Sequence, residues 1–361
     1  MVYKIFGKNI KFIFDDIRVE NILLDELNLY PQVEKGSIDV EIYFVEKIVQ
    51  EAKQYISPSN HISFFGGFQA NYGRNIVKYI KTDILRIYIE VHDSDFIRKF
   101  IGIDFNSSIE GVGEILHELV LIPMIHFFDD LAIIHASSFR NLDTDEVYVI
   151  GGTGGVGKTS TEIMFCLKDN FSFISDDIAV VDNEGNIYPN LSFPKIYAYN
   201  VDGNDSIKQV ILQNDNLIGK FQWYFIKTLM GPKRIRRRLS AKVLYKKYEN
   251  DKQCISKYFI LTKNNLIDKM KKNKFNNLND VVSVTQKVIE NEYHVFYQHV
   301  KWHEYNCMLN NITPILTLED IENRQNYILN KSLQNIENYV VSIPKDISHK
   351  DFLLNIEKVL V

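Results

Sequence analysis

The feature of this sequence that most constrains its fold is a glycine-rich segment at residues 152–159. The segment reads GTGGVGKT and fits the pattern GxxxxGK[ST], and the apolar run VYVI stands just before it. Glycines let successive backbone N–H groups turn toward phosphate oxygens, and a helix that follows adds its positive N-terminal end. A chance match in a glycine-rich loop is the alternative, and the correct flanks on both sides argue against it. The segment therefore predicts a strand, a phosphate-binding loop and a helix, in that order.

The residue types in this loop also suit a nucleotide. Lys158 supplies a mobile positive charge for the β- and γ-phosphates, and the hydroxyl of Thr159 is suited to bind Mg²⁺. We predict ATP and Mg²⁺ as cofactors, although no base-reading motif separates ATP from GTP or another donor. The residues expected to bind the nucleotide are Gly152, Thr153, Gly154, Gly155, Val156, Gly157, Lys158, Thr159 and Ser160.

Two adjacent aspartates, Asp176 and Asp177, follow a second apolar segment, FSFIS. Adjacent acids after a strand are often a solvated turn or a helix cap. Beside a phosphate loop they also suit Mg²⁺ binding or removal of a proton from a hydroxyl. Asp176 comes 18 residues after Lys158, which leaves room for one helix and one returning strand, and this early position is typical of kinases. Two neighbouring carboxylates can divide the work, one binding metal and the other, with a raised pKa, accepting a proton.

The run HAS…VYVIGGTGGVGKTS…FISDDIAVVDNEGNIYPNLSFPK resembles the carboxy-terminal kinase domain of HPr kinase/phosphorylase and its relatives. That family shares a P-loop fold with phosphoenolpyruvate carboxykinase. Its pattern is a strand bearing a histidine, a hairpin into the P-loop, a short helix, and a strand that ends in two aspartates. The corresponding positions here are His135, Gly152–Thr159, Thr159–Lys168 and Asp176-Asp177. The likeness covers about residues 110–200 and is only architectural over 250–361.

The resemblance does not extend to residues 1–105, and the family's own substrate-recognition signature is not visible beyond Lys195. The chain is therefore more similar to the diverse HPr-kinase-like group, which includes kinases of free serine and of serine in ribosomally made peptides. The resemblance implies that Asp176 is the general base and that Asp177 orients or binds Mg²⁺. It implies that His135 lies near the phosphates, where it polarises the γ-phosphoryl group or holds an aspartate. Taken alone, a histidine on an apolar strand is more often a core residue.

A basic segment stands at residues 231–252, with nine basic and two acidic residues. One interpretation is a solvated helix face. Another is an anion site, in which Arg234, Arg236, Arg237 or Arg238 reaches the transferring phosphoryl group or an acidic substrate. Nucleic-acid binding is the third, and the segment lacks interleaved stacking aromatics, which argues against it.

The remaining pattern predicts an α/β protein with two domains. Residues 1–109 form a smaller strand-rich α+β domain for substrate or partner recognition, with strands at 10–14, 37–44 and 84–91 and a short helix at 46–55. Residues 110–361 form a P-loop kinase core of the HPr-kinase/PEP-carboxykinase type with a mixed sheet. Its expected elements are a helix at 111–130, a hairpin of strands 131–139 and 147–150, and a helix at 158–168. Further elements are strands at 171–175, 178–181, 257–262 and 339–343, a helical, irregular region at 205–257, and a helix at 350–360.

Composition narrows the setting. A net charge of −4, with 45% hydrophobic and 24% charged residues, excludes a disordered chain and a uniformly basic nucleic-acid binder. The three cysteines, Cys166, Cys254 and Cys307, form no close pair, and the first residues show no signal peptide, so we expect a reducing cytoplasm. The longest apolar stretch, 119–128, is about half of the roughly 20 residues that span a bilayer, so we expect no membrane partner.

The leading functional hypothesis is an ATP-dependent kinase that transfers the γ-phosphoryl group to a serine-type hydroxyl of a peptide, protein or small molecule. The alternatives are a small-metabolite P-loop kinase of the shikimate or gluconate type, a nucleotide-binding regulatory module without catalysis, and a nucleic-acid ATPase. The metabolite kinases usually begin at the P-loop, whereas 151 residues precede it here. The expected partners are a hydroxyl-bearing acceptor and, as an open option, further copies of the chain.

Overall fold

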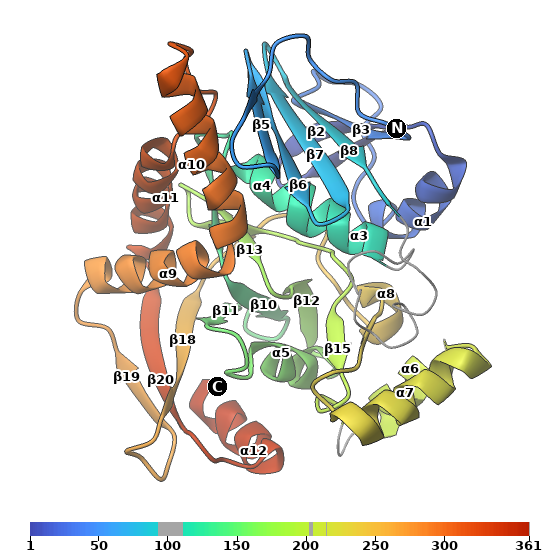
Figure 1. Ribbon diagram of the computed structural model, residues 1–361. Coiled ribbons are helices and arrows are strands. Elements are labelled where there is room, and N and C mark those ends of the chain that lie inside the picture. The colour runs from blue at the N-terminus through green and yellow to red at the C-terminus, as the bar shows by residue number, and fades with distance from the viewer. Residues whose placement is uncertain (93–110, 202–204, 214, 361) are drawn as a thin grey trace. The chain divides into compact units, whose positions relative to one another are not determined.

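The computed structural model describes residues 1–92, 111–201, 205–213 and 215–360 (Figure 1). It is a mixed α/β protein with several sheets, and its chain divides into two compact units. The described part of the first unit comprises residues 1–92, 111–131 and 290–325, and that of the second comprises residues 132–201, 205–213, 215–289 and 326–360. Each unit therefore combines separate stretches of the sequence. The predicted domain boundary between residues 109 and 110 lies outside the described residues.

The first unit is built on an eight-stranded mixed sheet with the order β1-β2-β3-β8-β7-β6-β5-β4. The neighbours β2, β3 and β8 are parallel, and the other pairs are antiparallel. A parallel pair needs a crossover, which α1 (Ile17–Leu27) supplies between β2 and β3. The strands are β1 (Val2–Ile5), β2 (Lys8–Phe14), β3 (Val40–Val45), β4 (Tyr55–Ile56), β5 (His61–Phe64), β6 (Gly67–Tyr72), β7 (Asn75–Lys81) and β8 (Leu85–Glu90). The three predicted strands of this region are confirmed.

The helix predicted for residues 46–55 is wrong, because the structure describes all of these residues and none is helical. Their backbone groups bind side chains of neighbouring strands instead of one another. The N–H of Ile48 donates to Glu90 Oε2 at 2.9 Å, and Lys78 Nζ donates to the carbonyl oxygen of Val49 at 2.9 Å. These partners are distant in sequence, so a local helical pattern does not reveal them.

The predicted helix at 111–130 is confirmed over its first part. It consists of α3 (Gly111–Ile115), the π-helical turn η2 (Leu116–Leu121) and α4 (Ile122–Ile125). The hydroxyl of Tyr79 donates to the carbonyl oxygen of Leu119 at 2.6 Å, which ties this helix to the sheet. The further helices that contribute to the first unit are α10 (His294–Leu309) and the early part of α11 (Leu318–Leu333).

Helix α10 meets the sheet through a buried group of histidines. His61 Nδ1 lies 3.2 Å from His299 Nδ1, and the Ser63 hydroxyl lies 2.9 Å from His61 Nε2 and 3.2 Å from His303 Nδ1. All three rings are buried, and burial lowers the pKa of His61 to about 3 and those of His299 and His303 to about 4. They are therefore neutral at physiological pH.

The second unit is built on a six-stranded mixed sheet with the order β12-β10-β11-β18-β20-β19. Strand β11 is antiparallel to β10 and parallel to β18, so the strand before the glycine-rich loop lies inside the sheet. The strands are β10 (Ala136–Asn141), β11 (Val147–Gly152), β12 (Phe171–Ser175), β18 (Lys257–Asn264), β19 (Lys271–Lys274) and β20 (Glu337–Pro344). The hairpin is confirmed, as are the strands predicted at 171–175, 257–262 and 339–343.

The strand predicted at 131–139 is two strands, because the chain changes sheets at His135. Its first half, β9 (Leu131–Ile134), belongs to a four-stranded sheet with the order β17-β14-β13-β9, while β10 stays in the central sheet. The other members are β13 (Ala179–Asp182), β14 (Asn186–Tyr188) and β17 (Gln253–Cys254). A short pair, β15 (Lys195–Tyr197) and β16 (Arg236–Arg238), forms a separate sheet.

Mainly aliphatic side chains from the six-stranded sheet, the four-stranded sheet and two helices form the core of the second unit. The helices that contribute are α9 (Leu278–Glu292), through Val281 and Val282, and α11, through Ile328, Leu329 and Leu333. The other helices of this unit are α5 (Lys158–Cys166), α6 (Asp205–Gln213), α7 (Leu217–Met230), α8 (Ala241–Leu244) and α12 (His349–Leu360). The helices predicted near 158–168 and 350–360 are confirmed.

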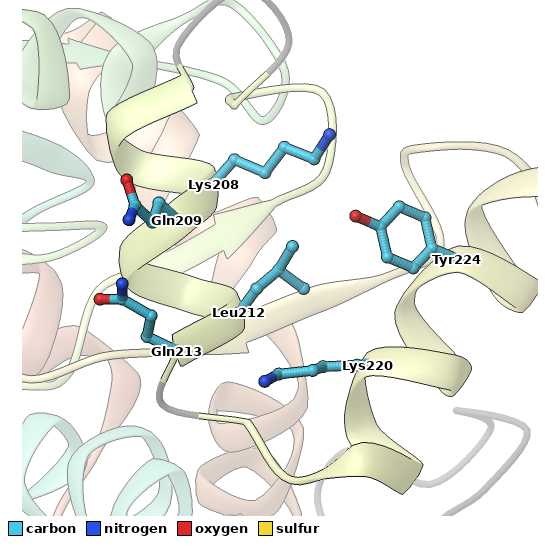
Figure 2. Close-up of a pocket in the computed structure, with 6 residues that line it drawn as sticks. All are labelled: Lys208, Gln209, Leu212, Gln213, Lys220 and Tyr224. Atoms are coloured by element: carbon cyan, nitrogen blue, oxygen red, sulfur yellow. The ribbon is translucent and has the colours of Figure 1, made fainter.

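Helices α6 and α7 lie on either side of an open pocket of about 520 Å³ (Figure 2). The residues that line it are Lys208, Gln209, Leu212, Gln213, Lys220 and Tyr224. The N-terminus of α7 is capped by Asn216, whose side chain accepts a hydrogen bond from the N–H of Gly219 at 2.8 Å.

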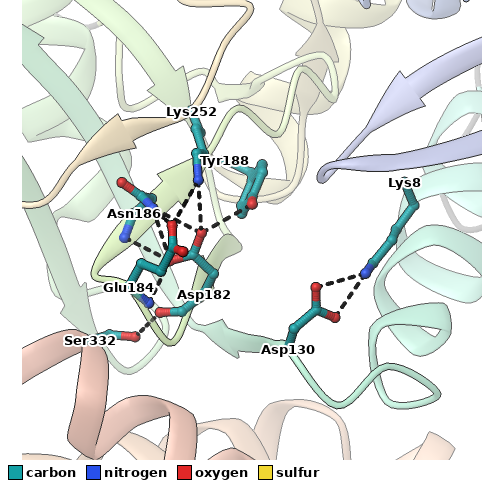
Figure 3. A network of polar contacts seen from close by, with 8 residues as sticks. All are labelled: Lys8, Asp130, Asp182, Glu184, Asn186, Tyr188, Lys252 and Ser332. Atoms are coloured by element: carbon teal, nitrogen blue, oxygen red, sulfur yellow. Dashed lines mark hydrogen bonds and ion pairs between the residues drawn. The ribbon is translucent and has the colours of Figure 1, made fainter.

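The turn between β13 and β14 is held by Asp182 (Figure 3). Its carboxylate accepts from the Asn186 backbone and side chain and from the Tyr188 hydroxyl, and Lys252 Nζ lies 3.6 Å away. The Ser332 hydroxyl of α11 donates to the carbonyl oxygen of Asp182 at 2.5 Å. In the first unit, Lys8 Nζ pairs with the Asp130 carboxylate at 2.7 Å.

Within the part of the chain that the structure describes, no helix is long and apolar enough to cross a membrane.

Candidate functional site

The predicted loop lies between β11 and α5, as the sequence requires. Gly152 and Gly157 have positive φ angles of 134° and 111°, which other residues rarely adopt. Gly157 also has no room for a side chain, because a methyl group there would collide with the ring of Phe352 from α12. Lys158 Nζ donates to the carbonyl oxygens of Gly152 and Thr153 at 3.0 and 3.1 Å. The loop therefore folds around its own lysine.

Asp176 lies at the end of β12 and contacts the loop directly. Its Oδ1 accepts a hydrogen bond from the Thr159 hydroxyl at 2.9 Å and another from the Ser137 hydroxyl on β10 at 3.0 Å. The residue is buried, and burial, together with the neighbouring charge of Asp177, raises the pKa of Asp176 above its ordinary value. A carboxylate in such surroundings is a stronger base than one in water.

Asp177 is the next residue but has different surroundings. Its side chain is 45% exposed, Oδ1 lies 3.0 Å from His135 Nε2, and Oδ2 lies 3.4 Å from Lys195 Nζ. Partial burial alone would raise the pKa of Asp177, but the charge of Lys195 and the hydrogen bond from His135 lower the pKa below its ordinary value. Asp177 is therefore ionised while Asp176 is the carboxyl that takes up a proton more readily.

The backbone separates the two carboxylates. Asp177 has a φ of +67°, and the N–H of Ile178 donates to the carbonyl oxygen of Asp176 at 2.8 Å, which closes a three-residue turn. A non-glycine residue in this region costs roughly 1 kcal/mol and is held there by its surroundings. The turn directs Asp176 toward the loop and Asp177 toward His135 and Lys195.

Sequence reasoning missed three polar residues of this site. Ser137 follows His135 by two positions and was visible only as part of an apolar strand. Lys195 stands on β15, and Asn200 shortly after it, where its Nδ2 donates to the Ser160 hydroxyl at 2.9 Å. The only signal for Lys195 was its place at the end of the run that carries the family resemblance.

A third acid lies behind the loop on α5. Glu162 is fully buried, and its carboxyl group lies close to the hydroxyl of Tyr245. Burial, with the charge of Asp176, raises the pKa of Glu162 well above its ordinary value. Glu162 therefore holds a proton more readily than an exposed glutamate does.

The predicted arginines do not form one group. Arg236, Arg237 and Arg238 lie on the strand β16, so a solvated helix face is the wrong interpretation for these three. Arg237 is buried and binds Asp215 Oδ2 at 2.8 Å, the carbonyl oxygen of Gly219 at 2.9 Å and Gln222 Oε1 at 3.0 Å. Its donors therefore hold α7 in place.

Two of the other arginines donate to hydroxyl groups. Arg236 donates to the Tyr197 hydroxyl at 3.1 Å, and Arg238 donates to the Ser192 hydroxyl at 3.4 Å. Arg234 is exposed. A contact with substrate stays a prediction for all four arginines.

The donor set suits a hard cation. Mg²⁺ is usually held by one or two carboxylates and by phosphate oxygens and water. Thr159, Asp176 and Asp177 supply a hydroxyl and two carboxylates next to the glycine-rich loop. Some metal sites are formed by protein ligands alone. The described residues contain no group of three or more His, Cys, Asp or Glu that could form such a site.

No protein-family model matches this chain, and no curated protein matches it either.

Proposed function

We propose that this protein is an ATP-dependent kinase that transfers the γ-phosphoryl group of ATP to a serine-type hydroxyl. The observation that carries the proposal is the hydrogen bond between Thr159 of the glycine-rich loop and Asp176. It joins a loop shaped for phosphate to a carboxylate whose pKa is raised. The proposal is based on these residues and not on the fold, because one fold can host many functions and the chemistry of a site decides which.

In the proposed reaction, the acceptor oxygen attacks the γ-phosphorus of ATP. The bond from that phosphorus to the β–γ bridging oxygen breaks, ADP leaves, and the hydroxyl proton moves to the Asp176 carboxylate. The raised pKa of Asp176 favours this proton transfer. Ser137 orients Asp176 through its hydrogen bond and does not touch the reacting atoms.

Asp177, Thr159 and Lys158 neutralise the charge of the phosphates in this proposal. Bound Mg²⁺ would be held by Asp177 and Thr159 and would draw charge from the phosphate oxygens. Lys158 would exchange its two carbonyl partners for phosphate oxygens when the nucleotide binds. His135 and Lys195 keep Asp177 ionised and in position.

The test is phosphoryl transfer from labelled ATP with Mg²⁺ to a lysate of the host, followed by identification of the labelled species by mass. Lys158→Ala should abolish labelling, because this side chain alone brings positive charge into residues 152–159. Lys168→Ala is the matched control, since it removes a half-buried lysine just beyond the other end of α5, where its partner is Glu357. Unchanged labelling in the Lys158→Ala protein would refute the proposed function.

A further inference from the structure

Helix α7 exposes a continuous apolar face. Leu217, Phe221, Phe225 and Leu229 recur every four residues and therefore share one side of the helix. Leu217 is 85% exposed, Phe221 60% and Leu229 68%, and Ile218, Tyr224 and Met230 are exposed as well. Single exposed apolar residues are ordinary, but a contiguous group of this kind marks an interaction surface.

The orientation of α7, which leaves its apolar face exposed, is set by contacts on the other side of the helix. Trp223 and Ile226 are buried on the opposite side. Arg237 binds the carbonyl oxygen of Gly219 and the side chain of Gln222, and Asn216 caps the first turn. A rotation of α7 that turned its apolar face inward would expose the buried Trp223. It would also break the hydrogen bonds of Arg237 to this helix.

Positive charge surrounds this face. Residues 205–240 contain eight basic and two acidic residues. One of the acids, Asp215, already pairs with Arg237 at 2.8 Å. Lys208 and Lys220 stand at the pocket beside Tyr224, with Lys208 Nζ 5.8 Å from the centre of the tyrosine ring (Figure 2). Lys233 and Arg234 are exposed just after the helix.

We propose that α7 lies on an anionic lipid surface, with its apolar face in the headgroup boundary and the neighbouring lysines against the lipid phosphates. A helix with leucine and phenylalanine on one side and lysine beside them has the composition of interfacial membrane helices. The 14 residues of α7 are about 21 Å long, which is too short to span a bilayer of about 30 Å. The length of the apolar stretches argues only against a segment that spans the bilayer, and a helix lying on the membrane surface needs no such segment.

Two other occupants fit less well. In a symmetric pair of chains, each copy of α7 would bring its lysines against those of the other, and like charges repel. Nucleic acid would match the positive charge, but leucine, isoleucine and methionine offer bases no ring on which to stack. This inference does not depend on the proposed kinase activity.

The test is flotation of the full chain with phosphatidylcholine vesicles that contain phosphatidylserine, compared with vesicles of phosphatidylcholine alone. We expect binding to the anionic vesicles only, and weaker binding as salt rises. Phe221→Ser with Phe225→Ser should lower the partition coefficient about tenfold or more. Lys220→Glu with Lys227→Glu should lower it by a similar factor.

Phe65→Ser is the matched control, because Phe65 is 86% exposed in the first unit, and it should leave partitioning unchanged. Circular dichroism checks that every variant is folded. The inference is overturned if the unaltered protein does not float with anionic vesicles at low salt. It is also overturned if it floats equally with neutral ones, or if the double phenylalanine variant floats as well as the parent. A dimer that dissociates in the phenylalanine variant, without vesicle binding, would assign the face to a second copy of the chain.

Discussion

Two adjacent residues of the same type acquire opposite acid–base properties in this protein. Asp176 is buried among hydroxyl groups, and Asp177 faces a lysine and a histidine. The sequence was sufficient to predict a division of labour between them, because adjacent carboxylates repel. It was not sufficient to predict which residues enforce it, because Ser137 and Lys195 are 39 and 18 residues from their aspartates.

Asp176→Asn tests the role of the buried carboxyl. The asparagine oxygen still accepts from Ser137 and Thr159, and the repulsion from Asp177 is gone, so we expect the protein to become more stable by about 1 kcal/mol. Phosphoryl transfer should fall by about 10²- to 10⁴-fold, because the variant lacks the proposed general base. Thermal unfolding and transfer assays on the same preparation measure both effects. A variant that is less stable and still active would show that Asp176 is a structural residue.

Lys195→Met tests what keeps Asp177 ionised. Without the lysine charge, the pKa of Asp177 should rise toward its ordinary value. Since Mg²⁺ binds the carboxylate and not the acid, the acidic limb of Mg²⁺-dependent nucleotide binding should move to higher pH. Lys195→Arg should restore the original profile, because arginine keeps the charge. Identical pH profiles for Lys195→Met and the unaltered protein would show that Lys195 does not control the ionisation of Asp177.

At the scale of elements, the β11–loop–α5 segment was predictable because its signals are local. The glycines, the lysine and the apolar strand stand next to one another in the sequence. Strand β16 was not predictable in this way, because Arg236–Arg238 form a strand only by pairing with Lys195–Tyr197. The break at His135 has the same origin, since β9 and β10 join different sheets.

The contact between α5 and α12 leads to a prediction about the loop. Phe352 is buried beside Gly157, so Phe352→Ala should lower the free energy of unfolding by about 3 kcal/mol and weaken nucleotide binding. Leu354→Ala is the matched control on the same helix, because Leu354 is largely exposed and should change stability by less than about 0.5 kcal/mol. Denaturant unfolding and titration with a fluorescent nucleotide measure the two quantities. Unchanged nucleotide affinity in a destabilised Phe352→Ala protein would show that the loop does not depend on its contact with α12.

At the scale of the whole molecule, the sequence predicted strands near the beginning and a P-loop core after them, but not the composition of the units. Residues 290–325 belong with the first unit, although they follow most of the second in the sequence. The cause is again long-range packing: His299 and His303 of α10 contact His61 and Ser63 of β5. Periodicity describes a helix but not the sheet on which it packs.

The buried histidines make the first unit sensitive to acid. Their pKa values fall from 6.5 to about 4 for His299 and His303 and to about 3 for His61, so the unfolded chain binds protons more readily than the folded one. Stability from these groups is complete above about pH 6.5 and decreases as the pH falls toward 4. The loss reaches about 1.4 kcal/mol per pH unit for each histidine.

Hydrogen exchange at pH 7 and pH 5, corrected for the intrinsic rates, measures this loss of stability. Segments 61–64 and 294–307 should lose protection at the lower pH. His299→Phe should reduce the change, because one protonation site is removed. Equal protection of these segments at the two pH values would contradict the burial of neutral histidines.

The contact between Gly157 and Phe352 also concerns how the protein is made. Phe352 follows Gly157 by 195 residues in the sequence. A ribosome that adds 5–20 residues per second needs about 10–40 s to synthesise that interval. During this time the nascent chain carries the complete glycine-rich motif without the ring that packs against it. A translation product that stops before residue 352 would therefore contain every residue of the loop and still lack the loop's contact with α12.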